Sequence, residues 1–304
     1  WNPYGQLGTT TADTCGTDPC SKSPLPVDLS DIAALAAGEQ HSLALASDGK
    51  VYAWGRNDQG QLGDGSTTDT AQPVLVAVPA SVTITKISAG AYHNLALDSD
   101  NNVWAWGMND AGQLGNGENS NRLSPIKVAS LAGVSAIGAG YKHSLAAKLS
   151  NGAVLAWGWN YHGQLGDGTH ANRNTPVTLG IVGVSAVSGG EKHSIALKGD
   201  TVWAWGSNGK GQLGRNGNES LKPVQVQQTG GSKALTGITA ISAGALHNLA
   251  LKSDKTVWSW GYDQSGQLGD NANKVDQNRA VRVFGISGIE AIAAGGYHSL
   301  AKTD

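Results

Sequence analysis

The sequence predicts an all-β protein, a β-propeller of four-stranded blades, because three motifs recur in one register with a period of about 50 residues. A fixed period of this length is the sequence signature of a repeat architecture. The first motif, His-Ser-Leu-Ala or a close variant, begins at His41, His93, His143, His193, His247 and His298. The second, Trp-Gly-x-Asn-x-x-Gly-Gln-Leu-Gly, begins at Trp54, Trp106, Trp157, Trp205 and Trp260, with Asp263 in the Asn place of the last copy. The third, Pro before alternating apolar residues, occurs at Pro26, Pro73, Pro125, Pro176 and Pro223, with Ala280 in the Pro place of the last copy.

Each unit is predicted to contain four short strands. Residues 42–45 and 51–54 form two of them, and the Asp-Gly pair between them is a strong signal for a tight hairpin. Residues 85–88 form a third strand, and Pro73 is expected to open a fourth over 74–76. No segment has a helical stripe of apolar residues, so very little helix is expected.

The sheets are predicted to stack around an axis and close into a ring, because an open stack would expose apolar ends. Trp104 and Trp106 are two residues apart, as are Trp203 and Trp205, so each pair should share one face of its sheet. Six repeats are counted, and seven would fit if the chain is an excerpt of a longer array.

These motifs closely resemble those of the regulator of chromosome condensation repeat family, over nearly the whole chain. The resemblance implies a propeller of four-stranded blades, most familiar with seven, whereas six copies are counted here. It also implies an alternative function, guanine-nucleotide exchange on a small GTPase, since the best-known member of the family is such an exchanger.

The two ends of the chain complement each other. Residues 1–8 align with residues 159–166, and the last residues stop where the hairpin turn of the sixth repeat would begin. One interpretation is that residues 1–29 pair with the repeat of His298 and close the ring, which makes residues 1–304 a single domain. The other is a longer array with further repeats. We expect the first.

A polar insertion, residues 9–25, contains the two cysteines of the chain, Cys15 and Cys20. A local disulfide is the simplest expectation, and it indicates an oxidising compartment, outside the cell or at its surface. Two free thiols would instead fit a cytoplasmic protein. A zinc site would need more ligands than this segment offers, because it contains no His.

Composition and motifs argue against several classes of function. Charged residues make up 14% of the chain and the formal net charge is −2, so binding to nucleic acid through phosphate neutralisation is not expected. No apolar run is long enough for membrane insertion. No catalytic, metal or cofactor motif is found, so we expect no enzyme activity, no metal and no cofactor. The six repeat histidines share one local context, which favours a structural task such as holding a turn.

Positions that vary between copies point to a binding surface. In an antiparallel hairpin, the residues before each repeat His and the residue after each Trp-Gly lie at the same end. The residues at these positions are rich in types that are enriched at protein interfaces. The predicted partner-binding residues are Trp1, Arg56, Tyr92, Met108, Tyr141, Lys142, Trp159, Tyr262 and Tyr297.

The sequence therefore predicts a non-enzymatic scaffold that presents an aromatic face to a protein partner of unknown identity. A second alternative is an inhibitor of a secreted enzyme, because the blade pattern loosely resembles that of the bacterial propeller β-lactamase inhibitor protein II. That protein lacks the repeated Gln-Leu-Gly found here.

Overall fold

The computed structural model describes residues 1–11, 13–231 and 233–303. Ala12 of the predicted insertion, Ser232 and the final residue Asp304 of the predicted domain lie outside the described residues. No helix is present in the part of the chain that the structure describes. Accordingly, no helix of those residues has the length and apolarity needed to cross a bilayer.

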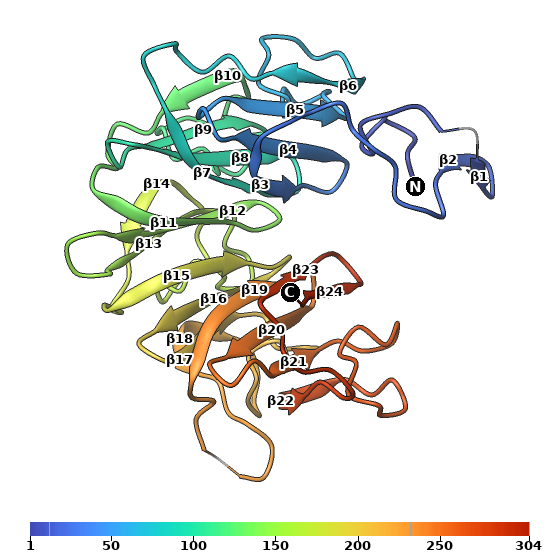
Figure 1. Ribbon diagram of the computed structural model, residues 1–304. Coiled ribbons are helices and arrows are strands. Elements are labelled where there is room, and N and C mark those ends of the chain that lie inside the picture. The colour runs from blue at the N-terminus through green and yellow to red at the C-terminus, as the bar shows by residue number, and fades with distance from the viewer. Residues whose placement is uncertain (12, 232, 304) are drawn as a thin grey trace.

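Five four-stranded antiparallel sheets form the blades, and they follow one another around an arc (Figure 1). Within each blade the strands pair in chain order. Blade 1 contains β3 (Ile32–Ala37), β4 (His41–Ala46), β5 (Val51–Gly55) and β6 (Thr70–Leu75). Blade 2 contains β7 (Ile84–Ala89), β8 (His93–Asp98), β9 (Val103–Gly107) and β10 (Arg122–Lys127). Blade 3 contains β11 (Val134–Ala139), β12 (His143–Lys148), β13 (Val154–Gly158) and β14 (Arg173–Thr178).

Blade 4 contains β15 (Val184–Gly189), β16 (His193–Lys198), β17 (Thr201–Gly206) and β18 (Ser220–Gln225). Blade 5 contains β19 (Ile238–Ala243), β20 (His247–Lys252), β21 (Val257–Gly261) and β22 (Gln277–Arg282). The sixth repeat supplies a two-stranded sheet, β23 (Ala291–Ala294) and β24 (Ser299–Lys302), which packs against blade 5. The predicted all-β fold of four-stranded blades is confirmed.

The strand that contains the repeat Pro begins earlier than predicted. Pro73 does not open its strand but lies inside β6, the outermost strand of blade 1. The register between β5 and β6 shifts between Ala53 and Gly55, next to this segment. An edge strand with a bulge tolerates proline, because no ladder hydrogen bond is needed from its nitrogen.

The core lies between the blades. One cluster combines Leu43 and Leu45 of blade 1 with Trp104 and Trp106 of blade 2, and the same arrangement repeats along the arc. Trp104 and Trp106 pack in one cluster, as the spacing of two residues predicts. Each of blades 2 to 5 therefore buries the tryptophan-bearing side of its sheet against the blade before it.

The two ends of the arc are separate elements. The strand pairs of the described residues include none between residues 1–8 and β23 or β24. Leu35 on β3 and Leu300 on β24 are exposed, although β3 and β24 occupy the positions of inner strands in their repeats. Closure of the ring by the two termini stays a prediction.

Packing between blades predicts a specific cost for a methyl group at Gly115. Gly115 has φ +72°, and a Cβ there would lie 2.8 Å from Nε1 of Trp157 in the next blade. Gly133 also has a positive φ, +63°, but a Cβ added at Gly133 would have no atom within 4 Å. We expect Gly133→Ala to lower the free energy of unfolding by about 1 kcal/mol and Gly115→Ala by about 2 kcal/mol more.

Chemical denaturation of both variants measures this difference. The Gly133 variant is the matched control, because it carries the backbone strain without the contact. Equal losses in the two variants would contradict tight packing of the Trp157 ring against the preceding blade.

Candidate functional site

The two sets of variable positions lie at the same end of each blade. In every complete blade the backbone N–H of the residue after Trp-Gly donates to the carbonyl of the residue before the repeat His. Four of these bonds are Arg56–Gln40 at 2.9 Å, Met108–Tyr92 at 2.9 Å, Trp159–Lys142 at 2.8 Å and Tyr262–Leu246 at 3.0 Å. Gly158 shows why the motif needs glycine there: its φ is +98°, and a Cβ would lie 2.6 Å from the carbonyl oxygen of Lys142.

Aromatic and cationic side chains form a continuous row from the N-terminal segment to blade 3. The ring centroids of Trp1 and Tyr4 are 6.3 Å apart, and the Arg56 guanidinium lies 5.1 Å from the Tyr4 centroid and 5.5 Å from that of Tyr92. Tyr92 then contacts Tyr141 edge to face at 6.3 Å. This geometry is favourable for aromatic pairs and for a guanidinium over a ring.

Two further groups of side chains occupy the same end of the blades. Tyr262 and Tyr297 pack edge to face with centroids 6.2 Å apart, and Lys210 lies over the Tyr262 ring. In blade 3, His162 stands between Trp159 and Tyr161 at 5.5 and 5.1 Å. The name "aromatic face" is used below for the end of the blades that carries these side chains. Its members are Trp1, Tyr4, Arg56, Tyr92, Met108, Tyr141, Lys142, Trp159, Tyr161, His162, Lys210, Tyr262 and Tyr297.

All nine predicted residues lie on the aromatic face, although the structure groups them unevenly. Trp1 and Tyr297 are exposed, whereas the other seven are half-buried. Tyr4, Tyr161, His162 and Lys210 were not predicted. They occupy the two positions between the repeat Asn and the following Gly, which also vary between copies and carried the signal that would have found them.

Charges on the aromatic face are mostly paired. Arg56 bonds Asp58 at 2.5 Å, and Lys142 bonds Asp110 at 2.7 Å. Burial raises the pKa of Tyr141, and the carboxylates of Glu39, Glu191 and Asp110 raise it further. Burial and a hydrogen bond to Glu39 likewise raise the pKa of Tyr92. Both phenols therefore stay protonated at neutral pH and can donate hydrogen bonds.

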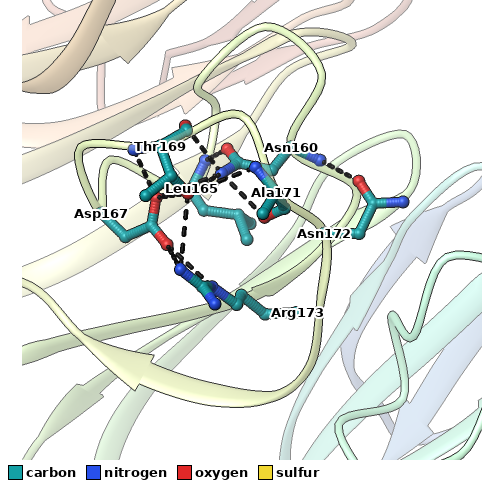
Figure 2. A network of polar contacts seen from close by, with 7 residues as sticks. All are labelled: Asn160, Leu165, Asp167, Thr169, Ala171, Asn172 and Arg173. Atoms are coloured by element: carbon teal, nitrogen blue, oxygen red, sulfur yellow. Dashed lines mark hydrogen bonds and ion pairs between the residues drawn. The ribbon is translucent and has the colours of Figure 1, made fainter.

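An internal hydrogen-bond network holds each loop of the aromatic face in place, as Figure 2 shows for blade 3. Asn160 is fully buried; its Oδ1 accepts from the Leu165 N–H at 2.9 Å, and its Nδ2 donates to the carbonyls of Thr169 and Ala171. Asp167 accepts from Arg173 at 2.9 Å. The side chain of the repeat Asn therefore stabilises this turn, and the loop carries Trp159, Tyr161 and His162.

Comparison with known proteins agrees with this geometry. Residues 1–301 match the model of the RCC1-like domain. The chain belongs to the RCC1-like domain family.

Individual relatives cover different shares of the chain. It is 34% identical over 303 residues to the ultraviolet-B receptor UVR8 of Arabidopsis thaliana, and this match spans 95% of the chain and 66% of the receptor. It is 33% identical over 280 residues to the human E3 ubiquitin-protein ligase HERC2, a match that spans 89% of the chain and 6% of the ligase. The chain thus spans less than two thirds of the length of these relatives.

Solved structures share the fold. Yeast RCC1 (Prp20), in its complex with Kap60, superposes with a TM-score of 0.79 at 25% identity, covering 91% of this chain and 69% of that one. Human WBSCR16 superposes with a TM-score of 0.84 at 24% identity, covering 100% of this chain and 80% of that one.

The repeat histidines of this RCC1-like domain have a structural role, but they do not hold a turn as expected. In the five complete blades, Nε2 of the histidine lies within hydrogen-bond distance of a Ser or Asn side chain in the next repeat. These pairs are His41–Asn94 at 2.8 Å, His93–Ser144 at 2.9 Å, His143–Ser194 at 2.9 Å, His193–Asn248 at 2.8 Å and His247–Ser299 at 3.0 Å. The sequence period could not show which blade each nitrogen reaches.

The partner of each histidine also fixes its tautomer. Ser144 donates its hydroxyl proton to the Gln113 carbonyl at 2.7 Å, so its oxygen accepts from Nε2–H of His93. Nδ1 then carries no proton, is buried and has no hydrogen-bond partner among the described residues. Protonation there would bury an unpaired charge, which is unfavourable.

The predicted disulfide between Cys15 and Cys20 is present and joins β1 (Asp13–Cys15) to β2 (Asp18–Cys20). This small hairpin contacts the aromatic face, because Nε1 of Trp1 donates to Asp18 at 2.8 Å. Among the described residues, no group of three or more His, Cys, Asp or Glu side chains is arranged to hold a metal ion.

The buried histidines predict a steep loss of stability in acid. Burial lowers the pKa of His41, His193 and His247 from 6.5 to about 4, and that of His93 and His143 to about 3. Above pH 6.5 these groups are neutral in both the folded and the unfolded chain. As the pH falls from 6.5 towards 4, the unfolded chain binds protons that the folded chain does not. Each histidine then removes about 1.4 kcal/mol of unfolding free energy per pH unit.

Urea denaturation between pH 7.5 and 4.5 measures this slope. His143→Gln keeps an N–H donor that does not titrate, so it should reduce the slope by about 1.4 kcal/mol per pH unit. The exposed His170→Gln is the control and should leave the slope nearly unchanged. An unfolding free energy that stays flat below pH 6 would contradict buried neutral histidines.

Proposed function

We propose that this RCC1-like domain is a non-enzymatic scaffold that binds a protein partner through its aromatic face. The observation that carries this proposal is the row from Trp1 through Tyr4, Arg56 and Tyr92 to Tyr141, which is continuous across three blades. Tyr, Trp and Arg are the residue types that dominate binding energy at protein interfaces.

Rigidity supports the same proposal. The loops under the aromatic face are pinned by buried Asn side chains, and edge-to-face contacts already order the Tyr rings. Side chains that are ordered before binding lose little conformational entropy when a partner docks. Among the relatives, yeast RCC1 was solved bound to another protein, Kap60. Nucleotide exchange and enzyme inhibition are the alternatives. A small GTPase as the partner would favour exchange, and a secreted enzyme as the partner would favour inhibition.

Site-specific crosslinking tests the position of the binding surface. A photo-crosslinking residue at Tyr161, which is 68% exposed on the aromatic face, should capture a partner. The same residue at Leu149, which is 61% exposed in the turn between β12 and β13 at the opposite end of blade 3, should not.

Affinity for the purified partner then measures the contribution of the rings. The triple variant Tyr92→Ala, Tyr141→Ala, Trp159→Ala should raise Kd at least about thirtyfold, because the loss of even one central aromatic residue costs about 2 kcal/mol or more. The double variant Leu149→Ala, Val182→Ala serves as the control. Unchanged affinity in the triple variant would refute the proposed surface.

We further propose that the protein works outside the cell or at the cell surface, with the cytoplasm as the alternative. The Cys15–Cys20 disulfide supports this, since structural disulfides persist mainly in oxidising compartments.

Thiol trapping during extraction from the native source tests the compartment. Mass spectrometry should find both cysteines resistant to alkylation until a reductant is added. Two alkylated cysteines in freshly trapped protein would support the cytoplasm instead.

A further inference from the structure

The aromatic face carries a row of residues whose backbones are joined from blade to blade. The N–H of Glu39 donates to the carbonyl of Ala91 at 3.2 Å, and that of Ala91 donates to Tyr141 at 3.2 Å. The N–H of Tyr141 continues the row to Gly190, the neighbour of Glu191, at 3.0 Å. Glu39, Tyr141 and Glu191 therefore occupy equivalent positions on blades 1, 3 and 4, and Ala91 holds the equivalent position on blade 2.

The charge along this row is unbalanced. Glu191 pairs with Lys192 at 3.0 Å and Asp110 pairs with Lys142 at 2.7 Å. Within the described part of the chain, Glu39 forms no ion pair with any Lys, Arg or His. Its carboxylate faces the hydroxyl of Tyr92 and is exposed, so it keeps free acceptor positions.

A guanidinium group fits this combination of an aromatic ring and a free carboxylate. Arginine stacks on aromatic rings and bonds carboxylates through two parallel N–H groups, and it is more weakly hydrated than lysine. The aromatic face already holds one example, since Arg56 lies over the rings of Tyr4 and Tyr92 while it bonds Asp58.

We propose that the partner protein inserts an arginine side chain beside Tyr141, with its guanidinium bonded to Glu39. The partner surface that docks here is accordingly basic at its centre and apolar around it. This inference rests on the proposed function and names the chemistry that the aromatic face selects.

Titration with a capped pentapeptide, Gly-Ser-Arg-Ser-Gly, tests the site by NMR. The ring signals of Tyr92 and Tyr141 should shift and saturate, and the same peptide with citrulline in place of arginine should cause no saturating shift. Glu39→Gln should weaken binding of the arginine peptide about tenfold, which is typical for the loss of one charged hydrogen-bond partner. Because Glu39 is exposed, its variant should keep the thermal midpoint of the parent.

Glu219→Gln is the matched control, an exposed glutamate beside His170 and outside this row, and it should bind as the parent does. Equal affinities of the parent and Glu39→Gln, equal binding of the citrulline peptide, or no shift at either tyrosine would each overturn the inference. The proposed function fails separately, since it depends on the Tyr92, Tyr141 and Trp159 variant and its crosslinked partner.

Discussion

At each interface between blades, one backbone carbonyl accepts hydrogen bonds from two side chains of the next blade, and the packing of the blades depends on it. The carbonyl of Gln113 in blade 2 accepts two hydrogen bonds from blade 3, one from Nε1 of Trp157 at 2.8 Å and one from Ser144 at 2.7 Å. Ser144 in turn accepts from His93 of blade 2. Four residues from two blades are therefore linked by hydrogen bonds in a buried interface, where removal of one partner would be costly.

The same arrangement recurs at the other interfaces. Gln61, Gln164 and Gln212 each offer their carbonyl to the Trp and the Ser or Asn of the following blade. Gln6 does the same for Trp54 and Ser42, so the N-terminal segment is attached to blade 1 as a preceding blade would be. The Gln-Leu-Gly motif and the repeat His and Trp thus serve one interaction, which explains why they recur together.

This interface separates stability from recognition. The residues that form it are buried and nearly identical between blades, whereas the residues one or two positions away, such as Tyr92, Arg56 and Trp159, differ from blade to blade. Substitution at the variable positions leaves the hydrogen bonds of the interblade carbonyl in place, because these side chains take no part in them. Different partners can be accommodated on one scaffold in this way.

Sequence reasoning identified the blades and nine residues of the aromatic face, because period and hairpin signals are local. It placed Pro73 at the start of a strand. The register shift between β5 and β6, which lets Pro73 lie inside β6, cannot be read from the alternation of apolar and polar residues. It assigned the histidines to a turn, because local sequence carries no sign of a distant partner. The structure shows that Nε2 of His93 bonds a residue 51 positions away. Tyr4 and His162 were missed, since they lie in loops that were interpreted only as turns. Closure of the ring stays a prediction.

Hydrogen exchange of the indole protons tests the central claim, that the interblade carbonyl holds the scaffold together. The Nε1 protons of Trp106, Trp157, Trp205 and Trp260 should exchange together, at least about a thousandfold more slowly than that of the exposed Trp1, because only global unfolding releases them. Exchange of these four protons as fast as that of Trp1, or one blade at a time, would contradict the claim.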